Sequence, residues 1–143
     1  MTAPPAAPDI TPEQRQKAET SLNNQPFARM IGMHLVDLRP GEAVIKIDMR
    51  DDLRQPAGLL HGGVTAALID TAMAYAVITR LAEGERASTV DLTVHYLRPH
   101  TEGIFTCTAK VVRAGKRIFT VSADVVNEQE KLIATSISTY TKV

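Results

Sequence analysis

The stretch that decides the fold is HGGVTAALIDTAMAYAVITRL, residues 61–81. Its apolar residues do not keep to one stripe but cover nearly all sides of a helix, and a helix of that kind is buried on most sides. The predicted helix runs from His61-Gly62-Gly63 to about Leu81. In a chain of 143 residues, a curled β-sheet is the element that can bury it.

Segments on both sides of this helix alternate between apolar and polar residues, which is the period of half-buried strands. They lie at residues 35–38, 43–49, 89–96, 105–111 and 119–125, with a last strand around Ile133 and Ile137. Residues 114–116 and 127–130 read as hairpin connections, which join antiparallel neighbours. The predicted fold class is therefore α+β, with a curled antiparallel sheet wrapped around one long central helix.

The N-terminal part has a different composition. Residues 1–10 are rich in Pro and Ala, and we predict that this segment is disordered. Thr11 can cap a short helix that runs to about Leu22, with a proline at the first helical position and a capping box. Residues 27–31 can form another helical turn. We expect residues 11–143 to form a single domain.

Composition narrows the possible partners. Sixteen basic residues balance sixteen acidic ones, which argues against nucleic-acid binding, since that needs a basic surface. The N-terminus lacks the basic start and apolar run of a secretory signal. The longest apolar stretch, Val64 to Ile78, contains Asp70 and is too short to span a bilayer comfortably. The only cysteine, Cys107, is expected in the core and fits a reducing compartment. We expect a soluble, cytoplasmic protein without membrane or nucleic-acid partners.

Asp70 is the most informative residue for function, because it is the only side chain between Gly63 and Ile78 that is charged at neutral pH. Carboxylates are rarely placed in an apolar helix unless they are paired or used. Burial raises the pKa of a carboxyl group, and a raised pKa suits a general base. The alternative is a structural aspartate bonded to a backbone or hydroxyl group, for which Thr71 is a candidate.

The entry of the predicted helix is the second candidate. Glycines let the backbone come close to a ligand, and the first free N–H groups of a helix stabilise developing negative charge. A simple helix-entry turn is the alternative. Gly62 and Asp70 are separated by about 12 Å along a helix, too far for both to address one carbonyl. If both act, one active site combines Gly62 of one subunit with Asp70 of another, most simply in a two-fold dimer.

Two motifs make the sequence similar to a known family. QPAGLLHGG at 55–63 and DTAMAYA at 70–76 resemble the hotdog-fold acyl-CoA thioesterases of the phenylacetate-pathway (PaaI-like) type. The similarity continues at residues 89–92 and 96–99 and covers roughly residues 25–143. The resemblance implies a hotdog fold, a site shared between subunits, and a homodimer that pairs into a homotetramer.

The resemblance also implies residue roles. Asp70 falls at the family's general base or nucleophile, and Gly62 at the backbone N–H that polarises the thioester carbonyl. His61 and Gln55 fall at loop positions that assist, the latter by holding the water or the carbonyl. Thr89 matches a Ser/Thr that can hydrogen-bond the attacking water.

Further residues are predicted to bind the substrate, namely Gly63, Thr71, Thr89 and Arg98. The phosphates of coenzyme A can be met by Arg98, Arg113, Lys116 or Arg117, although solvated hairpin charges are an equal interpretation of each. Many relatives carry Ser or Thr one turn after the acid, where this chain has Ala74. That difference removes one possible orienting hydrogen bond.

The sequence therefore predicts hydrolysis of an acyl-CoA, aryl-acyl or medium-chain, to a free acid and coenzyme A. No metal or separate cofactor is expected, because His34, His95 and His100 lack metal-ligand spacing. The first alternative is a non-catalytic acyl-CoA-binding or sensor domain on the same fold. The second is an acyl-CoA hydratase or dehydratase, which usually wants an Asp/His pair that we do not find.

Overall fold

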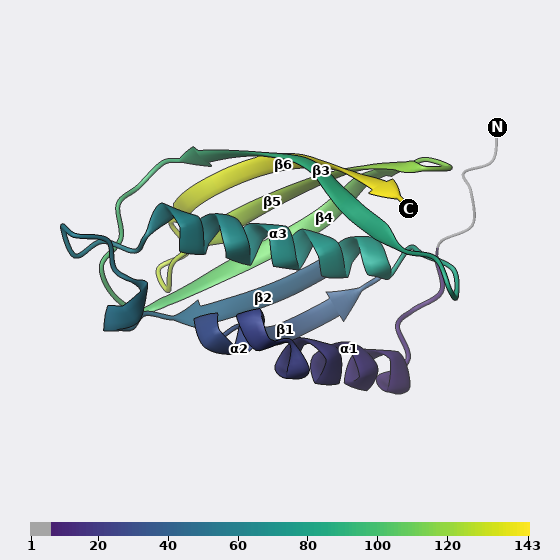
Figure 1. The fold of residues 1–143 in the computed structure, drawn as a ribbon, viewed down its shortest axis with the longest axis horizontal. Helices are drawn as coiled ribbons and strands as arrows, with labels where there is room; N and C mark the ends of the chain where they lie inside the picture. Colours follow the sequence, from purple (N-terminus) through teal and green to yellow (C-terminus); the bar gives the residue numbers. More distant parts are fainter. Residues whose placement is uncertain (1–6) are drawn as a thin grey trace.

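The computed structural model describes residues 7–143, and Figure 1 shows its fold. Of the segment predicted to be disordered, residues 1–6 lie outside the described residues, and residues 7–11 lie outside helices and strands. The elements follow one another along the chain as α1 (Pro12–Asn24), α2 (Pro26–Ile31), β1 (His34–Arg39), β2 (Glu42–Asp48), a 3-10 turn (Asp51–Leu53), α3 (Gly62–Ile78), β3 (Ala87–Tyr96), β4 (Ile104–Ala114), β5 (Ile118–Val126) and β6 (Leu132–Lys142).

The predicted capping box at the start of α1 is confirmed. The Gln14 N–H donates to Thr11 Oγ1 at 3.1 Å, and the Thr11 N–H donates to Gln14 Oε1 at 2.9 Å. These bonds satisfy backbone N–H groups that a helix start leaves free. The helix runs two residues past the predicted end at Leu22, and Leu22 is its one buried residue.

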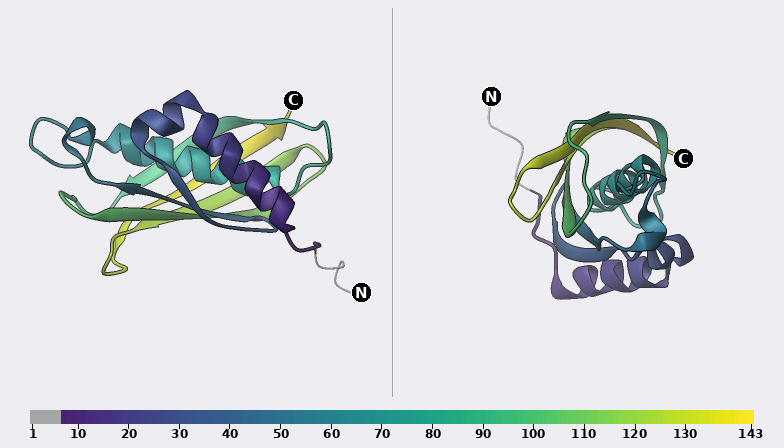
Figure 2. Two further views of the ribbon diagram at one scale, coloured as in Figure 1. Left: turned by 90° about the horizontal axis from the view of Figure 1, so that it is seen from below. Right: turned by 90° about the vertical axis from the view of Figure 1, so that its left-hand side faces the viewer.

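Within residues 7–143 the sheet has six strands in the order β1-β2-β4-β5-β6-β3, and every neighbouring pair is antiparallel. It curls around α3, which is seen nearly end-on inside the curve in the right-hand view of Figure 2. Strand β3 precedes β4 in the chain but lies at the far edge, beside β6. The prediction of an α+β fold with a curled antiparallel sheet around one long helix is confirmed.

The core lies between the sheet and one side of α3. Leu68, Ile69 and Met73 of the helix are fully buried. They face the inward side chains of the central strands, whose fully buried members include Ile45, Ile47, Phe105, Cys107, Val121 and Val125. The predicted alternation of β2, β4 and β5 is therefore the alternation between core and solvent.

Helix α3 differs from the prediction in two ways. It ends at Ile78 rather than Leu81, because the N–H groups of residues 80 and 81 bond three residues back instead of four. Its surface is also not buried all round. Five residues form a half-exposed stripe, and Ile78 at its end is 54% exposed; the five are Ala66, Ala67, Asp70, Thr71 and Ala74. We call these five residues the open stripe of α3.

The two edges of the sheet are treated differently. Helix α1 covers the β1 edge, where Arg15 donates to the Val36 carbonyl at 2.7 Å and pairs with Asp37 at 3.1 Å. Strand β3 pairs with β6 only, within residues 7–143. Two large side chains on it, Val90 and Tyr96, are 58% and 55% exposed. The described part of the chain contains no helix long and apolar enough to cross a membrane.

Candidate active site

Asp70 lies on the open stripe of α3 and is half-buried. Two hydroxyl groups donate to the same oxygen of its carboxylate. Thr89 Oγ1 on β3 lies 2.8 Å from Asp70 Oδ1, and Tyr140 Oη on β6 lies 2.6 Å from it. The tyrosine hydroxyl is also 2.8 Å from the Asp70 carbonyl oxygen. Thr89 and Tyr140, which lie 19 and 70 positions from Asp70 in the sequence, thus hold this one carboxylate.

Tyr140 is a functional candidate that the sequence analysis missed. It is only 2% exposed. Burial, and next the hydrogen bond to Asp70, raise the pKa of its phenol well above the ordinary value, so the group remains a neutral donor. The sequence did contain one signal, because alternation places Tyr140 on the same face of β6 as Ser136 and Ser138. A tyrosine hydroxyl that is buried on such a face usually requires a hydrogen-bond partner.

Thr89 contacts Asp70 because of a β-bulge. Simple alternation along β3 assigns Thr89 to the polar face and Val90 to the helix face. The register between β3 and β6 shifts between Thr89 and Asp91, so Thr89 lies on the helix side and Val90 is left exposed. A bulge inserts one residue and re-aims a side chain in this way.

The second carboxylate oxygen of Asp70 is open. Oδ2 takes part in no hydrogen bond with residues 7–143. No buried side-chain oxygen or nitrogen in that range lacks a partner, so Oδ2 must reach the surface. An oriented carboxylate with one free oxygen can accept a proton or attack an electrophilic carbon. The alternative of an aspartate bonded to hydroxyl groups is thus met by Thr89 and Tyr140, whereas Thr71, the candidate for it, makes no side-chain hydrogen bond to Asp70 in the described structure.

The start of α3 forms a second group of candidate residues. His61 is the N-cap, and its Nδ1 accepts the Gly63 N–H at 2.8 Å. The Gly63 N–H is therefore already engaged, which counts against its predicted contact with a substrate. The Gly62 N–H bonds to no acceptor within the described residues. Tyr96 Oη donates to the Gly62 carbonyl at 2.7 Å, and fixes this glycine beneath its ring.

Gly62 opens onto a hollow of about 320 Å³ that two loops and the start of α3 surround. Its lining includes Gln55, Gly62, Tyr96, Arg98 and His100. Gln55 Oε1 accepts the Ala57 N–H, so the opposite end of its amide is a pair of N–H donors. The structure therefore brings together three of the predicted residues, Gln55, Gly62 and the exposed Arg98.

The predicted residues fall into two separate groups on one chain. We call Asp70, Thr89 and Tyr140 the acid half-site, and Gln55, Gly62 and Arg98 the donor half-site. Both begin from α3, where Gly62 and Asp70 are separated by about 12 Å of continuous helix. One chain alone cannot direct both half-sites at a single carbonyl group.

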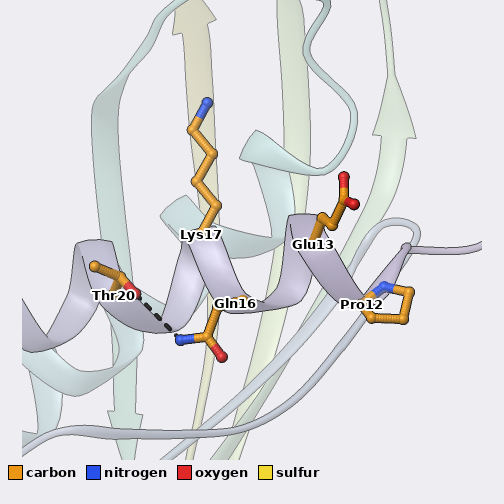
Figure 3. Close-up of a pocket in the computed structure, with 5 residues that line it drawn as sticks. All are labelled: Pro12, Glu13, Gln16, Lys17 and Thr20. Carbon is orange, nitrogen blue, oxygen red and sulfur yellow. Dashed lines mark hydrogen bonds between the residues drawn. The ribbon is translucent and has the colours of Figure 1, made fainter.

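Other surface features do not add to these groups. Figure 3 shows a face of α1 formed by Pro12, Glu13, Gln16, Lys17 and Thr20, with a hydrogen bond of 3.3 Å from Gln16 to Thr20. All five are exposed and come from one helix, so their polar groups do not converge from facing elements.

Arg113, Lys116 and Arg117 are exposed around the β4–β5 turn, which lies at the opposite end of the domain from the start of α3 (Figure 1). Because they lie far from the donor half-site of the same chain, their contact with the phosphates of coenzyme A stays a prediction.

Burial, followed by the charge of Asp124, raises the pKa of the Cys107 thiol well above its ordinary value. This is the inert core thiol that the alternation predicts. His100 packs edge-on against Phe105, with ring centroids 4.6 Å apart.

Comparison with known proteins identifies the class. The model of the thioesterase superfamily matches residues 57–134, more than half of the chain. The chain belongs to the thioesterase superfamily, and the predicted resemblance to PaaI-like thioesterases is confirmed.

Individual relatives agree with this. The chain is 30% identical to the medium/long-chain acyl-CoA thioesterase YigI of Escherichia coli K12, over 92% of this chain and 96% of that protein. It is 30% identical to the acyl-coenzyme A thioesterase PaaI of E. coli K12, over 83% and 84% of the two chains. The solved structure of the E. coli PaaI protein superposes with a TM-score of 0.83 at 28% identity, over 90% and 92%.

Proposed function

We propose that the chain hydrolyses acyl-CoA thioesters to a free acid and coenzyme A, at an active site that two copies share. One copy supplies the acid half-site and the other supplies the donor half-site. The observation that carries this proposal is the carboxylate of Asp70. Two hydroxyl donors hold its Oδ1, and its Oδ2 is open on the uncovered stripe of α3.

Three features of the single chain support a shared site. The half-sites are too far apart on one helix to meet. The open stripe that carries Asp70 consists otherwise of small residues, which let a second helix approach closely. The neighbouring edge of β3 has no strand partner within residues 7–143, and open edges are usually covered in a functional protein. A second copy related by a two-fold axis covers the stripe and the edge together. Pairing of such dimers into a tetramer stays a prediction.

In the general-base route, Asp70 Oδ2 accepts a proton from water while the water oxygen bonds to the thioester carbon. The Gly62 N–H and the positive end of the α3 dipole stabilise the negative charge that develops on the carbonyl oxygen. When the tetrahedral intermediate collapses, the C–S bond breaks and the proton on Asp70 passes to the departing thiolate. The products are the acid and coenzyme A.

In the nucleophilic route, Asp70 Oδ2 itself bonds to the thioester carbon and the C–S bond breaks. Water then hydrolyses the mixed anhydride and regenerates the carboxylate. Both routes use the same open oxygen and the same donors. Thr89 and Tyr140 hold Oδ1 in either case, and they supply the orienting bond that Ala74 cannot provide.

Gln55 acts as a donor in this scheme. Its Oε1 is taken by the Ala57 N–H, which leaves the Nε2 hydrogens as its available donors at the hollow that Gln55 and Gly62 both line. An amide N–H and a backbone N–H that approach one oxygen form a two-donor oxyanion site. His61 orients the Gly63 N–H and thereby the first turn of the helix, so its contribution is to the geometry of the donor half-site.

Substrate binding follows from the same arrangement. Arg98 lies in the hollow with Gly62 and makes no ion pair within the described residues, so it can meet a phosphate of coenzyme A. Arg113, Lys116 and Arg117 are further candidates. We propose a medium-chain or aryl-acyl group, a cytoplasmic location, and no metal or additional cofactor. A relative named as a medium/long-chain thioesterase supports the first of these acyl classes.

The test compares the hydrolysis of a panel of acyl-CoA thioesters by the wild type and by Asp70→Asn. The rate is measured from the free thiol that hydrolysis releases. We expect Asp70→Asn to lower kcat by about 10³-fold or more, since it removes the base or nucleophile but keeps the shape of the side chain. Equal rates for the two proteins would remove Asp70 from the mechanism. Tight acyl-CoA binding without turnover by the wild type would favour the sensor alternative, and hydration of an enoyl-CoA would favour the hydratase.

A further inference from the structure

The loop between the 3-10 turn and α3 is a small hairpin. Arg54 and Leu60 form an isolated antiparallel bridge, and the Gln55 N–H donates to the Leu59 carbonyl at 2.8 Å. The Gly58 N–H closes the turn by donating to the Gln55 carbonyl at 2.9 Å. Gly58 has φ +86°, a conformation that favours glycine. Gln55 therefore lies at the base of a tight turn, and its direction depends on how that turn is anchored.

One side chain anchors the turn. Arg54 donates to the Gly58 carbonyl at 2.8 Å inside the turn and to the Thr101 carbonyl at 2.6 Å in the β3–β4 connection. Its other nitrogens donate to Glu102 Oε1 at 2.7 Å and to Asp51 Oδ1 at 2.9 Å. The side chain is only 22% exposed. The guanidinium thus joins three separate segments of the chain.

Two of the segments that Arg54 joins are the two loops of the donor half-site. The turn carries Gln55, and the β3–β4 connection carries Arg98 and His100, all on the same hollow. A backbone bond from the Leu60 N–H to the His100 carbonyl, at 2.8 Å, is a second link between these loops. The Arg54 guanidinium therefore links the turn that carries Gln55 to the connection that carries Arg98.

We infer that Arg54 is a positioning residue of the thioesterase site, which fixes the Gln55 turn against the β3–β4 connection so that Gln55 and the Gly62 N–H face one oxygen. This inference rests on the proposed function. Arg54 itself does not touch the substrate. A lysine cannot replace it, because an ammonium group lacks the planar fork that reaches two carbonyls and two carboxylates in different directions.

The experiment is a double-mutant cycle on kcat with an acyl-CoA that the wild type hydrolyses. We expect Arg54→Met and Gln55→Ala each to lower kcat about tenfold, and Gln55→Ala to cost less than about twofold once Arg54→Met is present. The reason is that a Gln55 displaced by the loss of Arg54 already contributes little to kcat, so removing its side chain changes little more. Arg54→Lys is put through the same cycle, and it supplies the coupling between residues 54 and 55 if Arg54→Met does not fold.

Arg15→Met is the matched control. Arg15 also bonds to a backbone carbonyl and a carboxylate, but at the β1 edge, away from both half-sites. It should lower stability as Arg54→Met does and leave kcat within about twofold of the wild type. Effects of Arg54 and Gln55 that simply multiply would overturn the positioning role while the thioesterase proposal stands. A wild type that hydrolyses no acyl-CoA would instead overturn the proposed function.

Discussion

The two half-sites of this protein are built in different ways. The acid half-site is held from within the folded domain, because Thr89 and the buried Tyr140 reach Asp70 from paired strands of the sheet. The donor half-site is assembled at the surface from loops, a helix end and backbone N–H groups. One half-site presents an oriented carboxylate and the other presents hydrogen-bond donors, and the proposed hydrolysis needs both. The sheet therefore fixes the acid and the loops fix the donors, and in the proposed shared site a second copy brings the two together.

The strongest way to break this arrangement is to prevent the second copy from docking. If Asp70 meets the partner's Gly62, the residue midway between them, Ala66, lies next to its own copy at the two-fold axis. We expect Ala66→Arg to place like charges together there, to yield folded monomers, and to lower kcat by about 10³-fold or more. Analytical ultracentrifugation and circular dichroism measure the two parts of this result. A folded, fully active monomer would contradict it.

The next largest effect is expected from removing one backbone donor. Gly62 is the first residue of α3, where proline is well tolerated and differs chiefly by lacking the N–H. We expect Gly62→Pro to lower kcat by about 10²- to 10³-fold, as for loss of an oxyanion donor. Gly62→Ala is the matched control, because it keeps the N–H and brings a similar carbon near the Tyr96 ring. Steady-state kinetics in which both variants lose the same activity would point to crowding rather than to the donor.

A smaller effect is expected within the acid half-site. Tyr140→Phe keeps the buried ring and removes the hydroxyl that donates to Asp70 Oδ1 at 2.6 Å. A hydrogen bond to a charged group contributes about 1.5–3 kcal/mol, so we expect kcat to fall by about tenfold or somewhat more. Thr89→Val should act in the same direction, and the two changes together should exceed either alone. Unchanged kcat in the double variant would mean that Asp70 needs neither hydroxyl.

The smallest effect is expected at the neighbour of the acid. Thr71 makes no side-chain hydrogen bond to Asp70 and lies on the open stripe. Thr71→Val keeps its shape, so we expect kcat to stay within about twofold of the wild type. KM for the acyl-CoA is the sharper measurement, because Thr71 was predicted to bind substrate. A large fall in kcat would move Thr71 into the acid half-site.

Local patterns predicted the elements but not their long-range contacts. The apolar run of α3, the capping box at Thr11 and the two hairpin turns all arise from neighbours in sequence, and all are confirmed. The place of β3 beside β6 depends on a pairing across the whole domain, which alternation cannot reveal. For the same reason Tyr140 was missed, since its contact with Asp70 spans 70 residues.

The candidate site shows the same division. Asp70 and Gly62 could be singled out because an acid in an apolar helix and glycines at a helix start are local anomalies. The inward turn of Thr89 required a bulge that only the observed register reveals. Asp70 is less buried in the single chain than the sequence predicted, because the sheet and α1 leave the stripe that carries it uncovered.

The most direct test of a shared site is complementation between two inactive variants. Chains carrying Asp70→Asn and chains carrying Gly62→Pro are co-expressed with different tags, and the mixed species is purified through both. Each mixed dimer contains one site with both native half-sites, so the account predicts about half of the wild-type kcat per dimer. Activity no higher than that of the two variants alone would show that each site is built within one chain.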